Sequence, residues 1–114
     1  MSKLMAMAIP ILPGKFDQWR QFTDKLNKEY KNEFVASRKS VNLHERTFLQ
    51  RTPDMDFVIV TLEGDDPMGG FQKLYSRDDA FTKWFLKEVI AVHGTDLTKP
   101  LPGPMPELIV DTQA

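Results

Sequence analysis

The segment 57–63 constrains the fold of this chain more than any other, because most of it, Phe-Val-Ile-Val-Thr-Leu, is apolar. Successive side chains of a β-strand point to opposite faces of a sheet, so a strand here has apolar side chains on both faces. Such a strand is typical of the centre of a sheet. The strand predicted at residues 4–11 is also apolar on both faces, with the small residues Ala6, Ala8 and Pro10 on one of them.

Residues 43–52 are expected to pair with this central strand in a hairpin. The connecting residues 53–56, Pro-Asp-Met-Asp, have the composition of a turn. Several charged side chains interrupt the segment 43–52, which is typical of the edge of a sheet.

A long helix is predicted from residue 15 to about residue 36, because large apolar residues recur there at steps of three and four and so form one stripe. These residues are Phe16, Trp19, Phe22, Leu26, Tyr30 and Phe34. A second helical region has two pieces. Asp66 followed by Pro67 predicts the start of a short helix, and a further helix is expected over residues 80–93, with Gly94 as its C-terminal stop.

The end of the chain predicts a last strand. Prolines at positions 100, 102, 104 and 106 exclude a helix, and residues 107–111, Glu-Leu-Ile-Val-Asp, suit a strand. The order β-α-β-β-α-β indicates an α+β chain of the ferredoxin-like sandwich type. We therefore expect one domain over residues 1–114, with a four-stranded antiparallel sheet and the helices on one of its faces. The other face of that sheet would be apolar and uncovered, which favours a homodimer formed through it.

Composition excludes several classes of function. Fifteen basic and sixteen acidic residues leave a net charge of −1, so we expect neither nucleic acid nor an anionic membrane as a partner. The chain has no cysteine, which excludes disulfides, thiolate catalysis and cysteine-ligated metals, and two histidines are too few for a histidine-rich metal site. We expect no metal and no cofactor. The apolar stretch 4–12 is too short to span a bilayer, and an intracellular, cytoplasmic protein is the simplest interpretation.

Three short motifs give the chain a resemblance to known proteins. They are Ala-Ile-Pro-Ile-Leu-Pro-Gly-Lys at 8–15, Leu-Glu-Gly at 62–64 and His-Gly-Thr-Asp-Leu at 93–97. With the predicted order of elements, they resemble the dimeric α+β barrel superfamily, and within it a small family of uncharacterised bacterial proteins. The superfamily includes cofactor-free monooxygenases, haem-degrading enzymes, lactone isomerases and non-catalytic ligand-binding modules. The resemblance therefore implies a homodimeric fold and does not choose among these activities.

The hairpin predicts a polar cluster at one end of the sheet. If Thr52 faces Phe57, then Arg46 faces Glu63, whereas a shift by one residue would place Glu45 opposite Glu63 and bring like charges together.

This pairing gathers His44, Arg46 and Glu63. Beside an apolar cavity, His44 would be an acid/base group, Arg46 an anion or enolate stabiliser and Glu63 the group that orients them. The alternative is a structural cross-strand ion pair.

Three further residues are candidates for ligand binding: Tyr75, Trp84 and His93. The two aromatic residues lie on helical stripes that face the sheet and could line a pocket for a small apolar ligand. His93 ends the second helical region, where it could interact with the helix dipole or, alternatively, face the pocket as a proton carrier. These patterns favour a small-molecule-binding protein with a possible cofactor-free monooxygenase- or isomerase-like activity. The alternative is a non-catalytic ligand-binding or assembly module.

Overall fold

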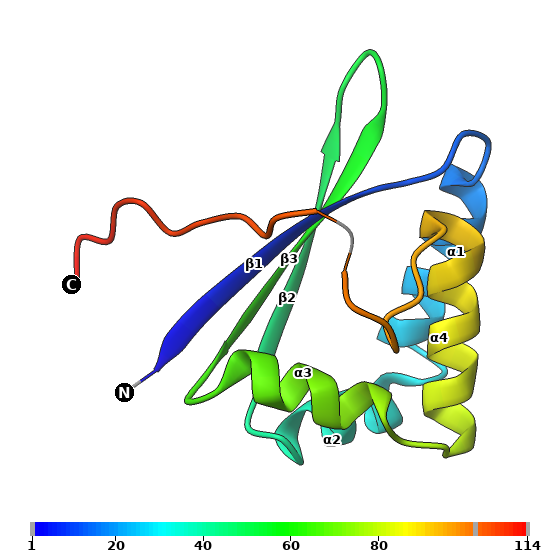
Figure 1. Cartoon of the computed structure of the whole chain (residues 1–114). Coiled ribbons are helices and arrows are strands. Elements are labelled where there is room, and N and C mark those ends of the chain that lie inside the picture. Colours follow the sequence, from blue (N-terminus) through cyan, green and yellow to red (C-terminus); the bar gives the residue numbers. More distant parts are fainter. Residues whose placement is uncertain (1, 102, 114) are drawn as a thin grey trace.

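The computed structural model describes residues 2–101 and 103–113, and this part of the chain is an α+β structure of three strands and four helices (Figure 1). The strands are β1 (Lys3–Pro10), β2 (His44–Arg51) and β3 (Asp56–Gly64). The helices are α1 (Phe16–Asn27), α2 (Lys31–Lys39), α3 (Pro67–Tyr75) and α4 (Ala80–His93). The strands form one antiparallel sheet in the order β1-β3-β2, and the helices lie on one side of it.

The positions of β3 and β2 confirm the sequence prediction, whereas β1, whose two apolar faces are typical of a central strand, is the other edge of the sheet. The doubly apolar strand β3 is central, and the charged strand β2 is an edge. The predicted register of the hairpin, however, is wrong by two residues, because Arg51 pairs with Asp56 and His44 pairs with Glu63. The turn closes one residue earlier on each strand than expected, through a hydrogen bond from the Thr52 amide to the Met55 carbonyl (3.1 Å). An even shift leaves every side chain on its predicted face.

Within residues 2–101 and 103–113 the sheet has three strands, not the four predicted for this fold. Residues 107–111 pair with no strand, and Leu108, Ile109 and Val110 are 59%, 77% and 77% exposed. Leu97, Leu101 and Met105 hold the preceding segment against the core. Beyond this anchor the described chain projects to the side of the sheet that is opposite to the helices (Figure 1). In the described residues, the ferredoxin-like order therefore lacks its last strand. Pro102, one of the residues predicted to exclude a helix, lies outside the described part.

The single helix predicted over residues 15–36 is also corrected, because α1 and α2 are separate helices. Between them, the amides of Lys28 and Tyr30 both donate to the carbonyl of Lys25, at 3.3 and 2.8 Å, and this closes α1. Tyr30 then stacks on Trp84 of α4, with ring centroids 4.1 Å apart. The break contains neither glycine nor proline, so no helix-breaking residue marks it in the sequence. What accompanies it is the contact of Tyr30 with α4.

The predicted ends of the other helices are confirmed. Asp66 accepts a hydrogen bond from the Gly69 amide (3.1 Å) and Pro67 is the first helical residue of α3. Asp79 caps α4 in the same way, and Gly94 ends it with φ of 69°, a left-handed conformation that glycine adopts without steric cost.

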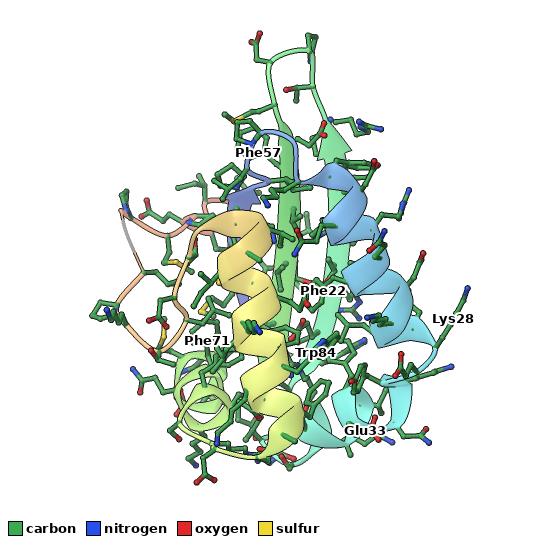
Figure 2. The ribbon with its side chains drawn as sticks, turned by 90° about the vertical axis from the view of Figure 1, so that its right-hand side faces the viewer. Phe22, Lys28, Glu33, Phe57, Phe71 and Trp84 are labelled. Carbon is green, nitrogen blue, oxygen red and sulfur yellow. The ribbon has the colours of Figure 1, made fainter. Side chains whose placement is uncertain are left out.

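The core lies between the helices and the face of the sheet that carries Met7, Val58 and Leu62. Figure 2 shows α1 and α4 in front of the sheet, with Phe22 and Trp84 between them and their ring centroids 5.4 Å apart. The opposite face, which we call the open face, has no helix over it. Within the described residues, no helix combines the length and the apolarity needed to cross a membrane.

Candidate functional site

A cavity of about 430 Å³ lies between the covered face of the sheet and the helices. Its size falls within the range of small-molecule pockets. Alternate residues of the strands form its floor, and aromatic and aliphatic residues of α1 and α4 form its roof. Among them are Met7, Val58 and Val60 below and Phe22, Phe85 and Val89 above. The middle of the cavity is therefore apolar on both sides.

The mouth of the cavity lies between α1 and the edge strand β2. Most lining residues are buried, but Arg20 and Asn27 of α1 and Thr47 of β2 are exposed, and Thr23 of α1 is half-buried. Because β2 is an edge strand with no neighbour beyond it, the space between β2 and α1 stays open.

Polar side chains line the cavity near both ends of the strands. Glu45 belongs to the row of Leu62, and His93 is bonded to Pro10, which belongs to the row of Phe57. These two rows are five positions apart on β3, or about 16 Å at the usual rise of a strand. The cavity thus has polar groups toward each end and, with Thr47 in the row of Val60, at its mouth, and apolar residues between them.

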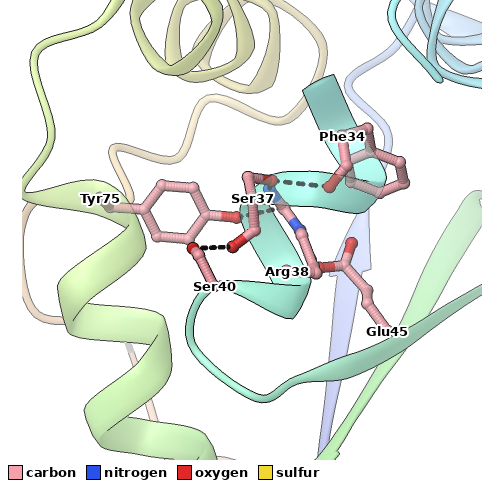
Figure 3. Close-up of polar contacts among 6 residues, drawn as sticks. All are labelled: Phe34, Ser37, Arg38, Ser40, Glu45 and Tyr75. Carbon is pink, nitrogen blue, oxygen red and sulfur yellow. Dashed lines mark hydrogen bonds and ion pairs between the residues drawn. The ribbon is translucent and has the colours of Figure 1, made fainter. Parts of the chain in front are cut away.

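Arg38 holds the end of the cavity near Glu45 together (Figure 3). Its side chain is buried, and its Nε donates to Glu45 Oε1 at 2.8 Å, its Nη1 to Ser37 Oγ at 3.0 Å and its Nη2 to Tyr75 Oη at 2.9 Å. The guanidinium also lies over the rings of Phe34 and Phe85, at 4.5 and 4.8 Å from their centroids. One side chain therefore connects α2, β2, α3 and α4.

The charges in this cluster are well defined. Burial lowers the pKa of Arg38, but Tyr75 and Glu45 more than offset this effect, so the pKa lies above its ordinary value. Burial raises the pKa of the Tyr75 hydroxyl, against the opposing effect of Arg38. Arg38 is thus a cation paired with Glu45, and Tyr75 is a neutral phenol.

His93 defines the other polar end. It is buried, and its Nδ1 lies 2.8 Å from the carbonyl oxygen of Pro10. A carbonyl oxygen only accepts, so Nδ1 carries the proton and Nε2 of the neutral ring carries a lone pair. Burial lowers the pKa of His93, while the bond to Pro10 acts in the opposite direction, so the ring is neutral near pH 7.

The structure separates the predicted site residues into two groups. Tyr75 and His93 line the cavity, whereas Trp84 is outside its lining and stacks on Tyr30; the predicted ligand-binding role of all three stays a prediction. Arg38 and Glu45 were not among the site residues predicted from the sequence. The signal for Arg38 was its spacing, since it follows Phe34 by four positions and so continues the apolar stripe of residues 16–34.

The predicted catalytic residues lie together, but on the open face. His44 pairs with Glu63 in the ladder, and Arg46 Nη1 reaches Glu63 Oε1 diagonally at 3.2 Å. All three are absent from the lining of the cavity, and the side chains of Arg46 and Glu63 are 45% and 40% exposed. Their catalytic role stays a prediction.

Metal ligands are sparse in the described structure. Across residues 2–101 and 103–113, no group of three or more His, Asp or Glu side chains is arranged to hold a metal ion.

Comparison with known proteins supplies no family for this chain. A scan of family models, a search of curated proteins and a search of solved structures each found no match. The resemblance to the dimeric α+β barrel superfamily stays a prediction, and the function has to be argued from the site itself.

The buried cluster allows a test by substitution. We expect Arg38→Met to lower the free energy of unfolding by about 3–5 kcal/mol, because it leaves the Glu45 carboxylate buried without its cation. The double variant Arg38→Met/Glu45→Leu should recover most of that loss, since both charges are then removed. Urea denaturation of the single and double variants measures both effects.

The control for this experiment is the exposed pair of Lys99 and Asp96, which is not on a strand. Lys99→Met should cost less than about 1 kcal/mol, because exposed ion pairs contribute little. A small effect of Arg38→Met, or losses that simply add in the double variant, would contradict the assignment.

His93 should make stability depend on pH. Its pKa is lower in the folded state than in the unfolded chain, so below about pH 6.5 the unfolded state binds more protons. The free energy of unfolding should therefore fall as the pH drops through this region. We expect His93→Asn to reduce the difference in stability between pH 7.5 and pH 5.5, measured by urea denaturation.

An equal difference in stability between the two pH values for the natural chain and for His93→Asn would show that His93 does not titrate as described.

Proposed function

We propose that this protein binds a small, mostly apolar molecule in the cavity between its helices and its sheet. The observation that carries the proposal is an apolar space of about 430 Å³ with polar side chains toward both ends and an opening between α1 and β2. Apolar walls with a few placed polar groups are typical of small-molecule sites, in which the polar groups orient the ligand.

The walls also favour a flat ligand. Phe22 and Phe85 form an edge-on pair with ring centroids 5.3 Å apart, and Phe71 and Tyr75 form another at 4.8 Å. All four line the cavity. Aromatic side chains interact well with the face or edge of another ring, so an aromatic ligand gains contacts that a branched one does not.

Binding is proposed here rather than a named reaction. The monooxygenase- or isomerase-like activity expected from the sequence depends on resemblance alone, whereas binding depends on the cavity. A non-catalytic ligand-binding module and an enzyme both need a cavity that binds the molecule. Only the enzyme would convert the bound molecule into a product.

The proposal can be tested with an apolar fluorescent probe, N-phenyl-1-naphthylamine, whose emission rises in an apolar site. We expect saturable binding by the natural chain and at least about a tenfold weaker affinity for Thr23→Trp, because the larger side chain fills the mouth. Gln21→Trp is the matched control on α1, since Gln21 is exposed and outside the cavity lining.

Gln21→Trp should bind the probe as the natural chain does. No saturable binding to the natural chain, or equal binding by the two tryptophan variants, would contradict the proposal.

We also propose that two copies of the chain associate through their open faces. Ala8, Ile59 and Phe48 form one row of this face, and Phe48 is 53% exposed. A row of apolar side chains on an uncovered sheet is a common mark of an interface. Arg46 and Glu63 lie on the same face with opposite charges, so a second copy related by a two-fold axis can offer each the complementary charge.

The C-terminal segment supports the same partner. It projects on the side of the open face, and its apolar residues 108–110 are among the most exposed in the described structure (Figure 1). A second copy on the open face would be close enough to cover them, so one association would bury both apolar surfaces.

Sedimentation velocity tests this assembly. We expect a mass of about twice 13.1 kDa at micromolar concentration, and a monomer for Phe48→Lys, because a buried lysine without a partner is costly. Met55→Lys, an exposed apolar position in the hairpin turn, is the control and should remain a dimer. A monomeric natural chain, or a dimeric Phe48→Lys variant, would contradict the assembly.

A further inference from the structure

Two acceptor atoms beside the cavity have no partner in the described part of the chain. At one end, Glu45 uses Oε1 to bind Arg38, and Oε2 makes no hydrogen bond within residues 2–101 and 103–113. At the other end, His93 uses Nδ1 to bind Pro10, and Nε2 is likewise without a hydrogen bond there. Since no fully buried side-chain nitrogen or oxygen of these residues lacks a partner, both atoms are at least partly accessible. The cavity is the space that both residues line.

The two ends of the cavity differ in what they can bind. At the Glu45 end, the Tyr75 hydroxyl accepts from Arg38 and can still donate its own proton, so this end offers both an acceptor and a donor. At the His93 end, Nε2 of the neutral ring can only accept. A ligand group at this end must therefore be a donor.

A hydrogen bond to a backbone carbonyl fixes the orientation of the His93 ring. Pro10 ends β1, and its carbonyl binds the ring of the last residue of α4. The amide of Leu12 also donates to the carbonyl of Val92 at 2.9 Å, which holds the same two segments together. The ring cannot turn over without losing its bond to Pro10, so the lone pair of Nε2 has a fixed direction.

We propose that the ligand is a flat aromatic molecule with a phenolic hydroxyl group, and that this hydroxyl donates a hydrogen bond to Nε2 of His93. This inference rests on the proposed function, because it names the class of molecule that the cavity takes. The aromatic walls select the ring, and the acceptor at the His93 end selects the hydroxyl. An ether or an unsubstituted ring in the same place leaves Nε2 without a partner and without water, which costs affinity.

Two probes of nearly the same shape test the inference on the natural chain. They are 2-naphthol, which has the hydroxyl, and 2-methoxynaphthalene, in which a methyl group replaces its proton. We expect 2-naphthol to bind about tenfold or more tightly, as measured by isothermal titration calorimetry or by fluorescence, since a lost hydrogen bond to a buried acceptor has an effect of this order.

The variant His93→Asn identifies the acceptor. The amide N–H of asparagine can replace Nδ1–H at the Pro10 carbonyl, and the lone pair of Nε2 is lost. The preference for 2-naphthol should fall to within about twofold in this variant. His44→Asn, which changes the histidine outside the cavity, should retain it.

The possible results separate this inference from the proposed function. Equal binding of the two probes by the natural chain would overturn the inference and leave binding in the cavity standing. Failure of both probes to bind would overturn both. A preference for 2-naphthol that is unchanged in a folded His93→Asn variant would also overturn the assignment of the acceptor to His93.

Discussion

The buried guanidinium of Arg38 is the interaction on which the rest of this structure depends. It binds a carboxylate of β2 and a hydroxyl of α3, and it lies over an aromatic ring of α4. A buried ion pair adds little stability relative to an apolar contact, but a buried charge that loses its partner is very unfavourable. The cluster therefore specifies one arrangement of the helices over the sheet. It also forms the polar wall of the cavity, because Glu45 and Tyr75 line it.

The arrangement of the layers creates two surfaces of different character. On the covered face, a cavity with polar groups toward both ends lies between the helices and the sheet. On the open face, β3 presents Ile59 beside Phe48 of β2, and no helix of the described chain covers them. The alternation of side chains along β3 assigns neighbouring residues to these two surfaces. Ligand binding and association of two copies can thus use the same strand without sharing a residue.

Local signals in the sequence predicted most elements of this fold. The capping residue Asp66, together with Gly94, marked helix ends that the structure confirms, because a cap is a contact between near neighbours. The failures depend on distant contacts. The break before α2 accompanies the packing of Tyr30 on α4, and the C-terminal segment finds no strand to pair with.

The candidate site was predicted in part for the same reason. Tyr75 was placed by helical periodicity and His93 by its position at the end of a predicted helix, and both line the cavity. The role of Arg38 depends in part on α3 and α4, which are distant in the sequence, and composition suggests only a solvated surface residue. The predicted group of His44, Arg46 and Glu63 does lie together, yet the sequence did not reveal which face of the sheet would be covered. The measurement that tests the account most directly is a methyl-detected NMR titration with 2-naphthol. Binding in the cavity predicts shifts of the methyl resonances of Val58 and Val60, with Ile59 between them unchanged. Shifts of Ile59 without those of its two neighbours would contradict the account.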